Sequence, residues 1–269
     1  MTVLIDGHVH TPYCPHGSTD SFKQYVEKAI SLGYQQMTFT EHAPFPDGFT
    51  DPTPKKDSAM KKEHLESYIK DVWRLKEEYL QDINILCGLE VDYLEGFEDQ
   101  TASMLHEYGP YLDDGILSVH FLKKDETWFC IDYNPDMFRQ MIDSFGSVEN
   151  VYKQYYETVL KSIQADLGPY KPKRIGHMTL VQKFQKKYPC NKDFSTQQKE
   201  ILLEIKRRNY ELDYNAAGLN KPLCQETYPP KSVIQQALEW NIPLVYGSDA
   251  HSVSALHQGR DLMWGITTS

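Results

Sequence analysis

No apolar run in this 269-residue sequence approaches the roughly 20 residues of a membrane-spanning helix, so we expect no membrane partner. Neither a basic region nor a small-residue cleavage site follows Met1, and we therefore expect no secretory signal. The five cysteines are an odd number, widely spaced and without a Cys-x-x-Cys pair. A disulfide framework is thus disfavoured, and free thiols in the reducing cytoplasm are predicted.

Positive charge is also scarce, with 28 Lys and Arg residues against 38 Asp and Glu residues and a net charge of -10. An acidic chain matches the phosphate backbone of nucleic acids poorly, so we expect none as a partner. A small phosphorylated substrate remains compatible, because bound cations can reverse the local field. Repeats, low-complexity tracts and linkers are absent, and we predict one domain over residues 1–269. The many Tyr and Phe residues would suit a homodimer, but no segment indicates an interface.

Two short motifs with metal-ligand side chains lie at opposite ends of the chain. Asp6-Gly7-His8-Val9-His10 follows the apolar run 3–5, and Ser248-Asp249-Ala250-His251 follows the run 243–246. In each motif two ligand-type side chains are spaced i and i+2, which places both on one face of an extended strand. Each motif alone is weak evidence, since a His-x-His pair is often an ordinary pair of histidines. On two neighbouring strands, however, they would form most of a metal site.

Strand and helix patterns alternate along the whole chain. We expect strands at 4–6, 36–39, 84–87, 115–119, 174–176, 211–214 and 244–246. Helices are expected at 22–30, 65–79, 152–163, 200–208 and 233–240, with a proline-rich loop at 47–56. Seven strands alternating with helices predict an α/β fold, a closed or nearly closed parallel (β/α)7 barrel similar to a TIM barrel. In such barrels the active site lies at the C-terminal ends of the strands.

The C-terminal ends of these strands carry polar side chains throughout. Six of the seven expected ends present a metal-ligand residue and one presents an amide; in chain order they carry His8 and His10, Glu41 and His42, Glu90, His120, His177, Asn215, and Asp249 and His251. Any one of these could be a core histidine or a helix cap, but their coincidence predicts a polynuclear metal site. Three further histidines fall in helical or loop contexts and are expected at the surface: His64, His106 and His257.

This constellation resembles the PHP (polymerase and histidinol phosphatase) superfamily, whose fold is a distorted seven-stranded barrel. The four family motifs match Asp6-Gly7-His8-Val9-His10, Thr40-Glu41-His42, the single histidines His120 and His177, and Ser248-Asp249-Ala250-His251, with Glu90 between the second and the third. The resemblance covers the whole chain. Polymerase-associated members of the superfamily occur in far longer chains and fit poorly.

A second set of segments is similar to the monofunctional histidinol-phosphate phosphatase branch. The segments are Pro15-His16-Gly17-Ser18, Glu41-His42-Ala43-Pro44, Gly88-Leu89-Glu90-Val91-Asp92-Tyr93 and Asp213-Tyr214-Asn215-Ala216-Ala217-Gly218-Leu219, followed by Lys221-Pro222 and Tyr228-Pro229. This similarity implies hydrolysis of L-histidinol phosphate to L-histidinol and inorganic phosphate in histidine biosynthesis. The metal motifs are shared with PHP phosphoesterases that act on sugar phosphates or nucleotides, so only the segment 215–229 favours this substrate over that alternative.

The resemblance implies a site for three divalent ions. His8, His10, Glu90 and Asp249 would bind the first ion, Glu90 would bridge to a second ion bound by His120 and His177, and His16, His42 and His251 would bind the third. The mixed nitrogen and oxygen ligands fit zinc, manganese or iron without distinguishing them. Imidazole ligands need acceptors for their second nitrogen. Asp6, Glu41 and Asp92 are candidates, although each could equally be an N-cap or a surface carboxylate.

Divalent ions acidify bound water and neutralise phosphoryl oxygens. We therefore expect Glu90, Asp249 and His251 to be catalytic: a hydroxide bridging the first two ions would attack phosphorus, and Asp249, His251 or a metal-bound water would protonate the leaving alkoxide. Asn215 is the leading candidate for substrate recognition, and Asp92 is a candidate for binding a substrate ammonium. Arg260 and Lys183 are candidate phosphate ligands, although a solvated surface charge is the commoner role of either cation taken singly.

Two interpretations from other functional classes fit less well. A non-catalytic metal-binding or polymerase-accessory module would be expected to have lost ligands, whereas this chain retains a complete set. A metal-dependent amidase on a related barrel would more typically bridge its ions with a carboxylated lysine, at the position where this chain offers Glu90.

Overall fold

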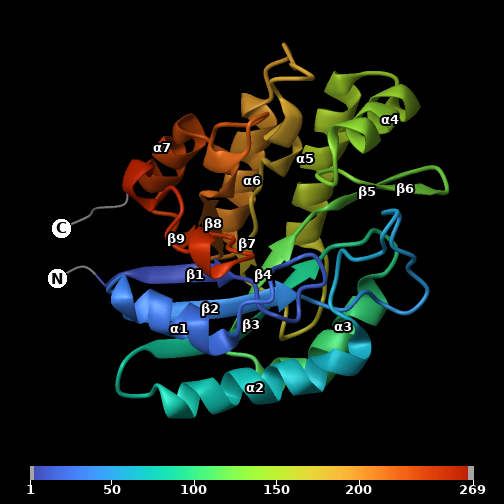
Figure 1. Cartoon of the computed structure of the whole chain (residues 1–269). Coiled ribbons are helices and arrows are strands. Elements are labelled where there is room, and N and C mark those ends of the chain that lie inside the picture. Colours follow the sequence, from blue (N-terminus) through green and yellow to red (C-terminus); the bar gives the residue numbers. More distant parts are fainter. Residues whose placement is uncertain (1–2, 266–269) are drawn as a thin grey trace.

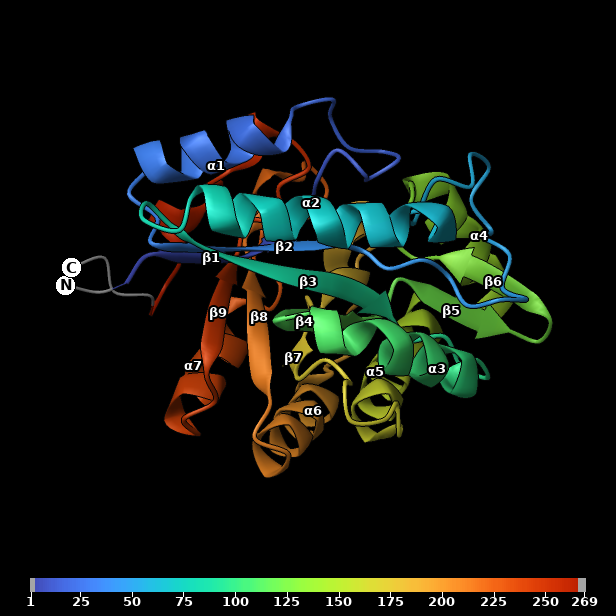
Figure 2. The same ribbon diagram turned by 90° about the horizontal axis from the view of Figure 1, so that it is seen from below.

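Seven parallel strands curve into a nearly closed barrel in the computed structural model, which describes residues 3–265 (Figure 1 and Figure 2). Their order is β1-β2-β3-β4-β7-β8-β9, with the bounds Ile5–Val9, Gln36–His42, Asn84–Asp92, Asp114–Ser118, Arg174–Ile175, Glu211–Asn215 and Leu244–Gly247. A parallel bridge between Val9 and Ala250 joins the first strand to the chain just beyond the last. The predicted seven-stranded α/β barrel is therefore confirmed, and its strands all end on the same side.

Helices pack on the outside of the barrel, as Figure 2 shows for α2 alongside β3. They are α1 (Phe22–Ser31), α2 (Leu65–Glu78), α3 (Glu98–Tyr108), α4 (Pro135–Phe145), α5 (Val148–Gln164), α6 (Ser195–Arg207) and α7 (Lys231–Glu239). In α2 the buried side chains recur every three or four residues, so one face packs on the sheet while the charged face meets solvent. Short 3-10 turns lie at Lys62–His64, Gly109–Tyr111, Leu180–Phe184, Ala217–Asn220, Val253–Ala255 and Arg260–Leu262.

Helices α3 and α4 and one hairpin were not predicted from the sequence. The end signals of α4 are nevertheless present: Asn134 caps the helix by accepting from the Met137 N–H at 2.8 Å, Pro135 occupies its first position, and Gly146 closes it with a φ of 88°. The hairpin pairs β5 (Phe121–Lys124) with β6 (Thr127–Cys130) outside the barrel. Helix α4 and the hairpin lie between β4 and β7, where they interrupt the simple alternation of strands and helices, whereas α3 lies between β3 and β4.

Arg174 fills the barrel interior away from the strand C-termini. Its Nη2 atom donates to the carbonyl oxygen of Gly7 at 2.9 Å and to Asp114 Oδ2 at 2.6 Å. The guanidinium side chain is 4% exposed. A methyl group at Gly7 would collide with Arg174, so this close approach requires glycine. The buried ion pair is thus a structural feature of the end opposite the predicted ligands.

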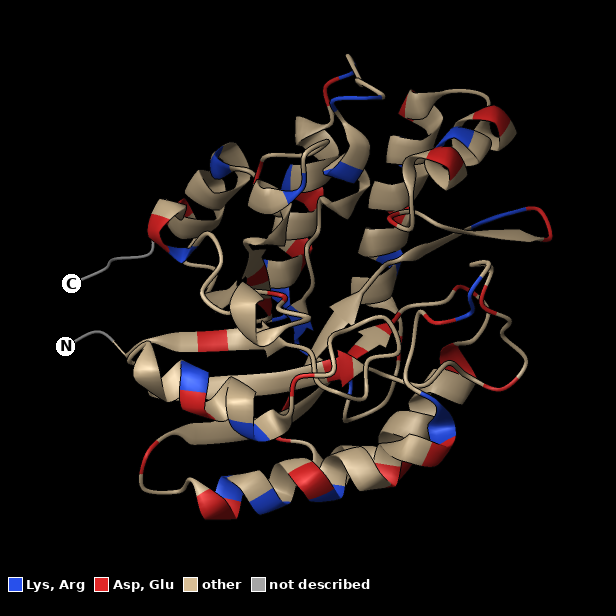
Figure 3. Cartoon of the chain, viewed as in Figure 1, with Lys and Arg blue, Asp and Glu red and all other residues tan. Residues whose placement is uncertain are grey.

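Charged residues of both signs are interspersed along α2, as Figure 3 shows. No helix within residues 3–265 is long and apolar enough to cross a membrane. Trp73 and Tyr111 are 40% and 57% exposed, and Trp73 Nε1 donates to the Tyr111 carbonyl at 2.9 Å. This aromatic pair does not by itself define an interface, and the homodimer stays a prediction.

We expect Arg174→Ala to lower the free energy of unfolding by about 3 kcal/mol, because the change leaves the Asp114 carboxylate without its buried cation. Urea denaturation of the metal-free protein would measure the loss. Arg139→Ala is the matched control, since Arg139 pairs with Asp143 at 2.7 Å but is 58% exposed, and it should cost less than about 1 kcal/mol. Equal losses in the two variants would contradict the structural role of Arg174.

Candidate metal centre

The predicted ligands come together at the C-terminal end of the barrel. His8 lies on β1 and His10 just after it, His42 and Glu90 lie at the ends of β2 and β3, and His120 and His177 follow β4 and β7. Asp249 and His251 follow β9, and His16 lies in the loop after β1. Strands in a parallel barrel all end on one side, so residues far apart in sequence converge there.

The Glu90 carboxylate lies at the centre of five imidazoles. Oε2 is 3.4 Å from His8 Nε2, 3.5 Å from His10 Nε2 and 3.1 Å from His42 Nδ1. Oε1 is 2.9 Å from His177 Nε2 and 3.7 Å from His120 Nε2. With both oxygens facing different imidazoles and a residue exposure of 2%, Glu90 has the geometry of a bridging carboxylate.

Asp249 closes the same cluster from the last strand. Its Oδ1 atom is 3.1 Å from His10 Nε2 and 3.7 Å from His8 Nε2. The backbone of Asp249 is left-handed (φ 54°), which an aspartate tolerates better than most residues, and its N–H donates to the His8 carbonyl at 2.8 Å. This contact holds the last motif against the first.

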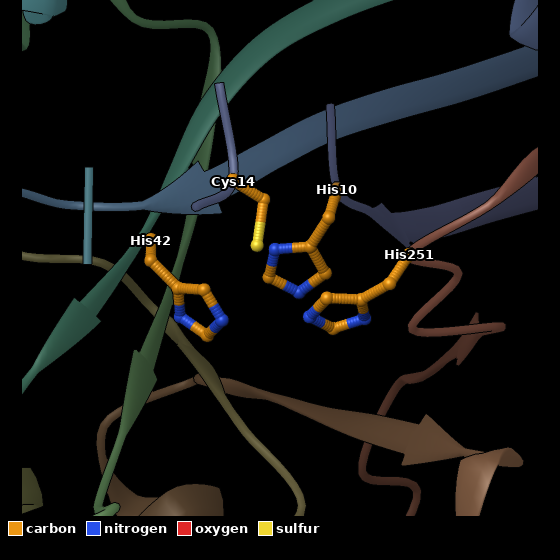
Figure 4. A group of neighbouring side chains, drawn as sticks. All are labelled: His10, Cys14, His42 and His251. Atoms are coloured by element: carbon orange, nitrogen blue, oxygen red, sulfur yellow. The ribbon is translucent and has the colours of Figure 1, made fainter. Parts of the chain in front are cut away.

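A third group of side chains lies beside this cluster. Figure 4 shows the imidazoles of His10, His42 and His251 together with the thiol of Cys14 pointing toward one another. One ligand atom from each of these four side chains lies within 4.8 Å of the others. His16 joins the group from its loop, with its Nε2 atom 3.2 Å from Nε2 of His251. Two ring nitrogens this close can share a proton in a hydrogen bond or bind a common cation.

Acceptors on the far side of the imidazoles orient them. Nδ1 of His8 is 3.0 Å from Asp213, Nδ1 of His120 is 2.8 Å from Asp92, and Nδ1 of His10 is 3.4 Å from Glu41. His16 and His251 are held by the carbonyl oxygens of Asp57 and Asp249, at 2.7 and 3.0 Å. Such partners select the ring tautomer and direct the other nitrogen toward the metal. Of the predicted candidates, Glu41 and Asp92 contact ligand imidazoles, whereas Asp6 accepts from the backbone N–H groups of His8 and Ser248.

The donor set fits divalent cations. The buried atoms His8 Nε2, His10 Nε2 and His42 Nδ1 have no hydrogen bond within the described part of the chain, although each faces a carboxylate oxygen 3.1–3.4 Å away. Burial raises the pKa of Glu90, but the surrounding His8, His120 and His42 lower it well below its usual range. Burial likewise raises the pKa of Asp249, and His8 and His10 lower it well below its usual range. Ionised carboxylates buried among nitrogen ligands need positive charge, which metal ions supply.

A cavity of about 380 Å³ opens on the metal-ligand cluster. Its lining includes His16, His42, His120, His177, Asp249 and His251, together with Lys55, Asp57, Asp132, Lys183, Lys221 and Tyr228. Of the four predicted substrate-binding residues, only Lys183 lines this cavity. A site for a small ligand therefore lies directly beside the predicted ligands.

The other three predicted substrate-binding residues are placed differently. Asn215 is fully buried and donates to Asp213 and Asp249, both at 3.2 Å, so it reaches the cavity only through Asp249. Arg260 is 5% exposed and lies over the Tyr246 ring, 5.0 Å from its centroid. Asp92 contacts His120 and does not line the cavity. These positions favour support of other residues over direct contact with substrate.

Asp213, Cys14 and Asp132 lie at or beside the site but were not predicted as site residues. Asp213 and Asn215 share the i, i+2 spacing of the recognised motifs on β8, so the spacing could have identified Asp213. Gly247 packs against Asp213, since a methyl group at Gly247 would collide with Asp213 and with the β-carbon of His8. Cys14 lies among the third group and Asp132 in the cavity wall, and neither belongs to a local pattern that marks a site.

Known proteins resemble this chain in both sequence and fold. The PHP domain family model matches residues 6–217. The chain is 50% identical to the histidinol-phosphatase of Bacillus subtilis (strain 168) over 248 residues, covering 91% of this chain and 92% of that protein. A candidate histidinol phosphatase structure from Listeria monocytogenes is similar at a TM-score of 0.91 and 41% identity, covering 96% and 99% of the two chains. The Lactococcus lactis histidinol phosphate phosphatase, solved with zinc, L-histidinol and phosphate, shares the fold at a TM-score of 0.65 and 20% identity, covering 96% and 92%.

We expect Asp213→Ala to weaken metal binding by about 10- to 100-fold, because His8 loses the acceptor that orients its ring. Titration of the metal-free protein with zinc would measure the affinity, and thermal unfolding would show that the variant folds. Asp143→Ala is the control, since its side chain is 59% exposed and distant from the site. An unchanged zinc affinity in a folded Asp213→Ala variant would disprove the orienting role.

Proposed function

This chain belongs to the PHP domain family, and we propose that it is a metal-dependent histidinol-phosphatase, which hydrolyses L-histidinol phosphate to L-histidinol and inorganic phosphate in histidine biosynthesis. The observation that carries the proposal is the buried Glu90 carboxylate, surrounded by five imidazoles beside a cavity, in a chain half identical to a histidinol-phosphatase. Together the ligand cluster and the similarity support both the chemistry and the substrate.

We propose that three divalent ions bind here. His8, His10 and Asp249 would hold one, His120 and His177 a second, and Glu90 would bridge the two, because its oxygens face the two groups separately. His16, His42 and His251 would hold the third, with Cys14 at its edge. The preference among zinc, manganese and iron is not determined by these ligand types.

Bound divalent ions supply an acidified water and neutralise the phosphoryl oxygens. The residues of the chain contribute position and charge. Asn215 holds Asp249 Oδ2 at 3.2 Å, and Ser118 Oγ donates to Glu90 Oε1 at 2.7 Å, so both carboxylates keep a fixed orientation. Asp249 and His251 line the cavity and are the candidates for protonating the leaving alkoxide. The low pKa of Asp249 favours a ligand role for it, because its carboxylate carries no proton to donate near neutral pH.

The remaining properties follow from the same proposal. Residues 1–269 would act as one domain, since the similarity to the Bacillus subtilis histidinol-phosphatase covers 91% of the chain. All five cysteines are free thiols, which is compatible with the proposed cytoplasmic location.

Glu90→Ala should abolish metal binding and activity together, lowering kcat/KM by at least about 10³-fold, because the change removes the shared carboxylate. Metal content by mass spectrometry and phosphate release would be measured on the same sample. Glu63→Ala, at a side chain that is 71% exposed, should leave both values unchanged. Full metal content with near-normal turnover in Glu90→Ala would reject the bridging role.

The substrate assignment is tested by phosphate release from L-histidinol phosphate and from a panel of sugar phosphates and nucleotides, with zinc- or manganese-loaded enzyme. We expect L-histidinol phosphate to be preferred by about 10³-fold in kcat/KM, which corresponds to about 4 kcal/mol of differential transition-state binding. A flat profile, or a better substrate elsewhere in the panel, would keep the phosphoesterase assignment and reject the histidinol-phosphate specificity.

A further inference from the structure

An ion pair forms part of the cavity wall beside the ligand cluster. Lys183 Nζ lies 2.9 Å from Asp132 Oδ2, and the two side chains are 19% and 23% exposed. Neither belongs to a barrel strand: Asp132 follows β6, and Lys183 lies in the turn Leu180–Phe184. Both line the same cavity as His120, His177 and Asp249. The pair can therefore contact a substrate whose phosphate lies beside the metal-ligand side chains.

The chemistry of an amino-alcohol phosphate complements this pair. L-Histidinol phosphate carries its phosphate and its ammonium on adjacent carbon atoms, so a cation and an anion lie close together in the ligand as well. A phosphate near Lys183 would compete with Asp132 for the lysine ammonium. Asp132 would then need a new cation, because an unpaired carboxylate in a partly buried position is costly. The ammonium of the ligand supplies it.

Two other carboxylates are less well placed for this role. Asp92 already accepts from the Nδ1 side of His120 at 2.8 Å and does not line the cavity. Asp57 lines the cavity, but from the loop that holds His16 through the Asp57 carbonyl. Asp132 is fixed from its other side, since Cys130 Sγ donates to its Oδ1 at 3.3 Å. Asp132 is thus the oriented carboxylate of the wall.

A buried hydroxyl in the same wall could also pair with a polar ligand. Tyr228 lines the cavity, the residue is 2% exposed, and its buried hydroxyl has no hydrogen-bond partner among the described residues. Buried hydroxyls without partners are rare, because each costs free energy unless a ligand or water pairs with it. The imidazole of the same substrate could supply that partner.

We propose that Lys183 and Asp132 form the recognition pair of the site, in which Lys183 binds the phosphate of the substrate and Asp132 binds its ammonium. This inference rests on the proposed function and extends it to substrate selection. An ester without an amino group would engage Lys183 and leave Asp132 unpaired, and the enzyme would discriminate against it. Selectivity for aminoalkyl phosphates thus comes from one carboxylate that is not a metal ligand.

The test compares L-histidinol phosphate with imidazolylpropyl phosphate, the same ester without the amino group. In the wild type, kcat/KM should be about 10- to 100-fold higher for L-histidinol phosphate, the range expected for one charge-assisted hydrogen bond. Asp132→Asn should remove most of that preference by lowering only the value for L-histidinol phosphate. Lys183→Met should lower both values equally, because both esters carry the phosphate. Asp136→Asn is the matched control, since its carboxylate lies 3.9 Å from a lysine but is 89% exposed.

The outcomes separate the two proposals. A wild-type enzyme that hydrolyses neither ester would overturn the proposed function and this pair with it. A wild type that hydrolyses both equally would overturn the Asp132 role alone, whatever the variants do. Equal losses on both esters in Asp132→Asn, with metal content and thermal stability retained, would assign Asp132 to supporting Lys183 instead. If Asp132→Asn does not fold, Asp132→Glu, which keeps the charge, should retain a preference for the amino ester, and its absence would reject the proposal.

Discussion

The burial of one carboxylate among five imidazoles organises this structure. An ionised glutamate as buried as Glu90 is unfavourable unless cations or hydrogen-bond donors surround it. The barrel provides that environment by ending β1, β2, β4 and β7 around the end of β3, so that each contributes an imidazole at 2.9–3.7 Å. An outer set of carboxylates, which includes Asp213 and Asp92, holds the rings in place. Positive and negative groups therefore alternate outward from the centre, and metal ions complete the charge balance.

The two ends of the barrel differ: one contains a structural ion pair, and the other contains the metal-ligand side chains. The Arg174–Asp114 pair lies in the interior away from the metal-ligand side chains. At the C-terminal end, unsatisfied nitrogen atoms and buried carboxylates accumulate. A site of this kind destabilises the empty protein, and ligands that bind only the folded state recover the loss. The parallel strands make this division possible because their two ends are chemically independent.

Elements outside the barrel shape the cavity. Phe45 and Phe49 pack on Phe121 of the β5–β6 hairpin, with ring centroids 5.3 and 5.4 Å apart, and Trp128 lies 5.2 Å from Phe49. This aromatic cluster anchors the loop that carries Lys55 and Asp57 to the cavity, while the chain after the hairpin brings Asp132. The barrel supplies the metal-ligand residues common to the motifs, and these additions supply the wall that a particular substrate would contact.

The sequence alone predicted the seven strands, the barrel and the group of ligand residues that the structure brings together. The strand and barrel predictions succeeded because apolar periodicity is a local property that can be counted along the chain, and the i, i+2 spacing likewise marked side chains that the structure brings together at the strand ends. Glu41 and Asp92 were candidate orienting residues because imidazole ligands need acceptors for their second nitrogen. Helix α4 had its cap signals and was missed because the interpretation assumed one helix after each strand.

Tertiary structure decided what each polar residue contacts. Asp213 orients His8 across 205 positions of sequence, and Asp132 meets Lys183 across 51, distances over which no local pattern extends. Cys14 comes beside His42 and His251 only when the loop after β1 folds over the strand ends. Asn215 was the leading candidate for substrate recognition and Arg260 a candidate phosphate ligand, but both are buried and neither lines the cavity. Residue type and spacing determine which side chains can bind metal, whereas packing of distant segments determines which of them face a common point.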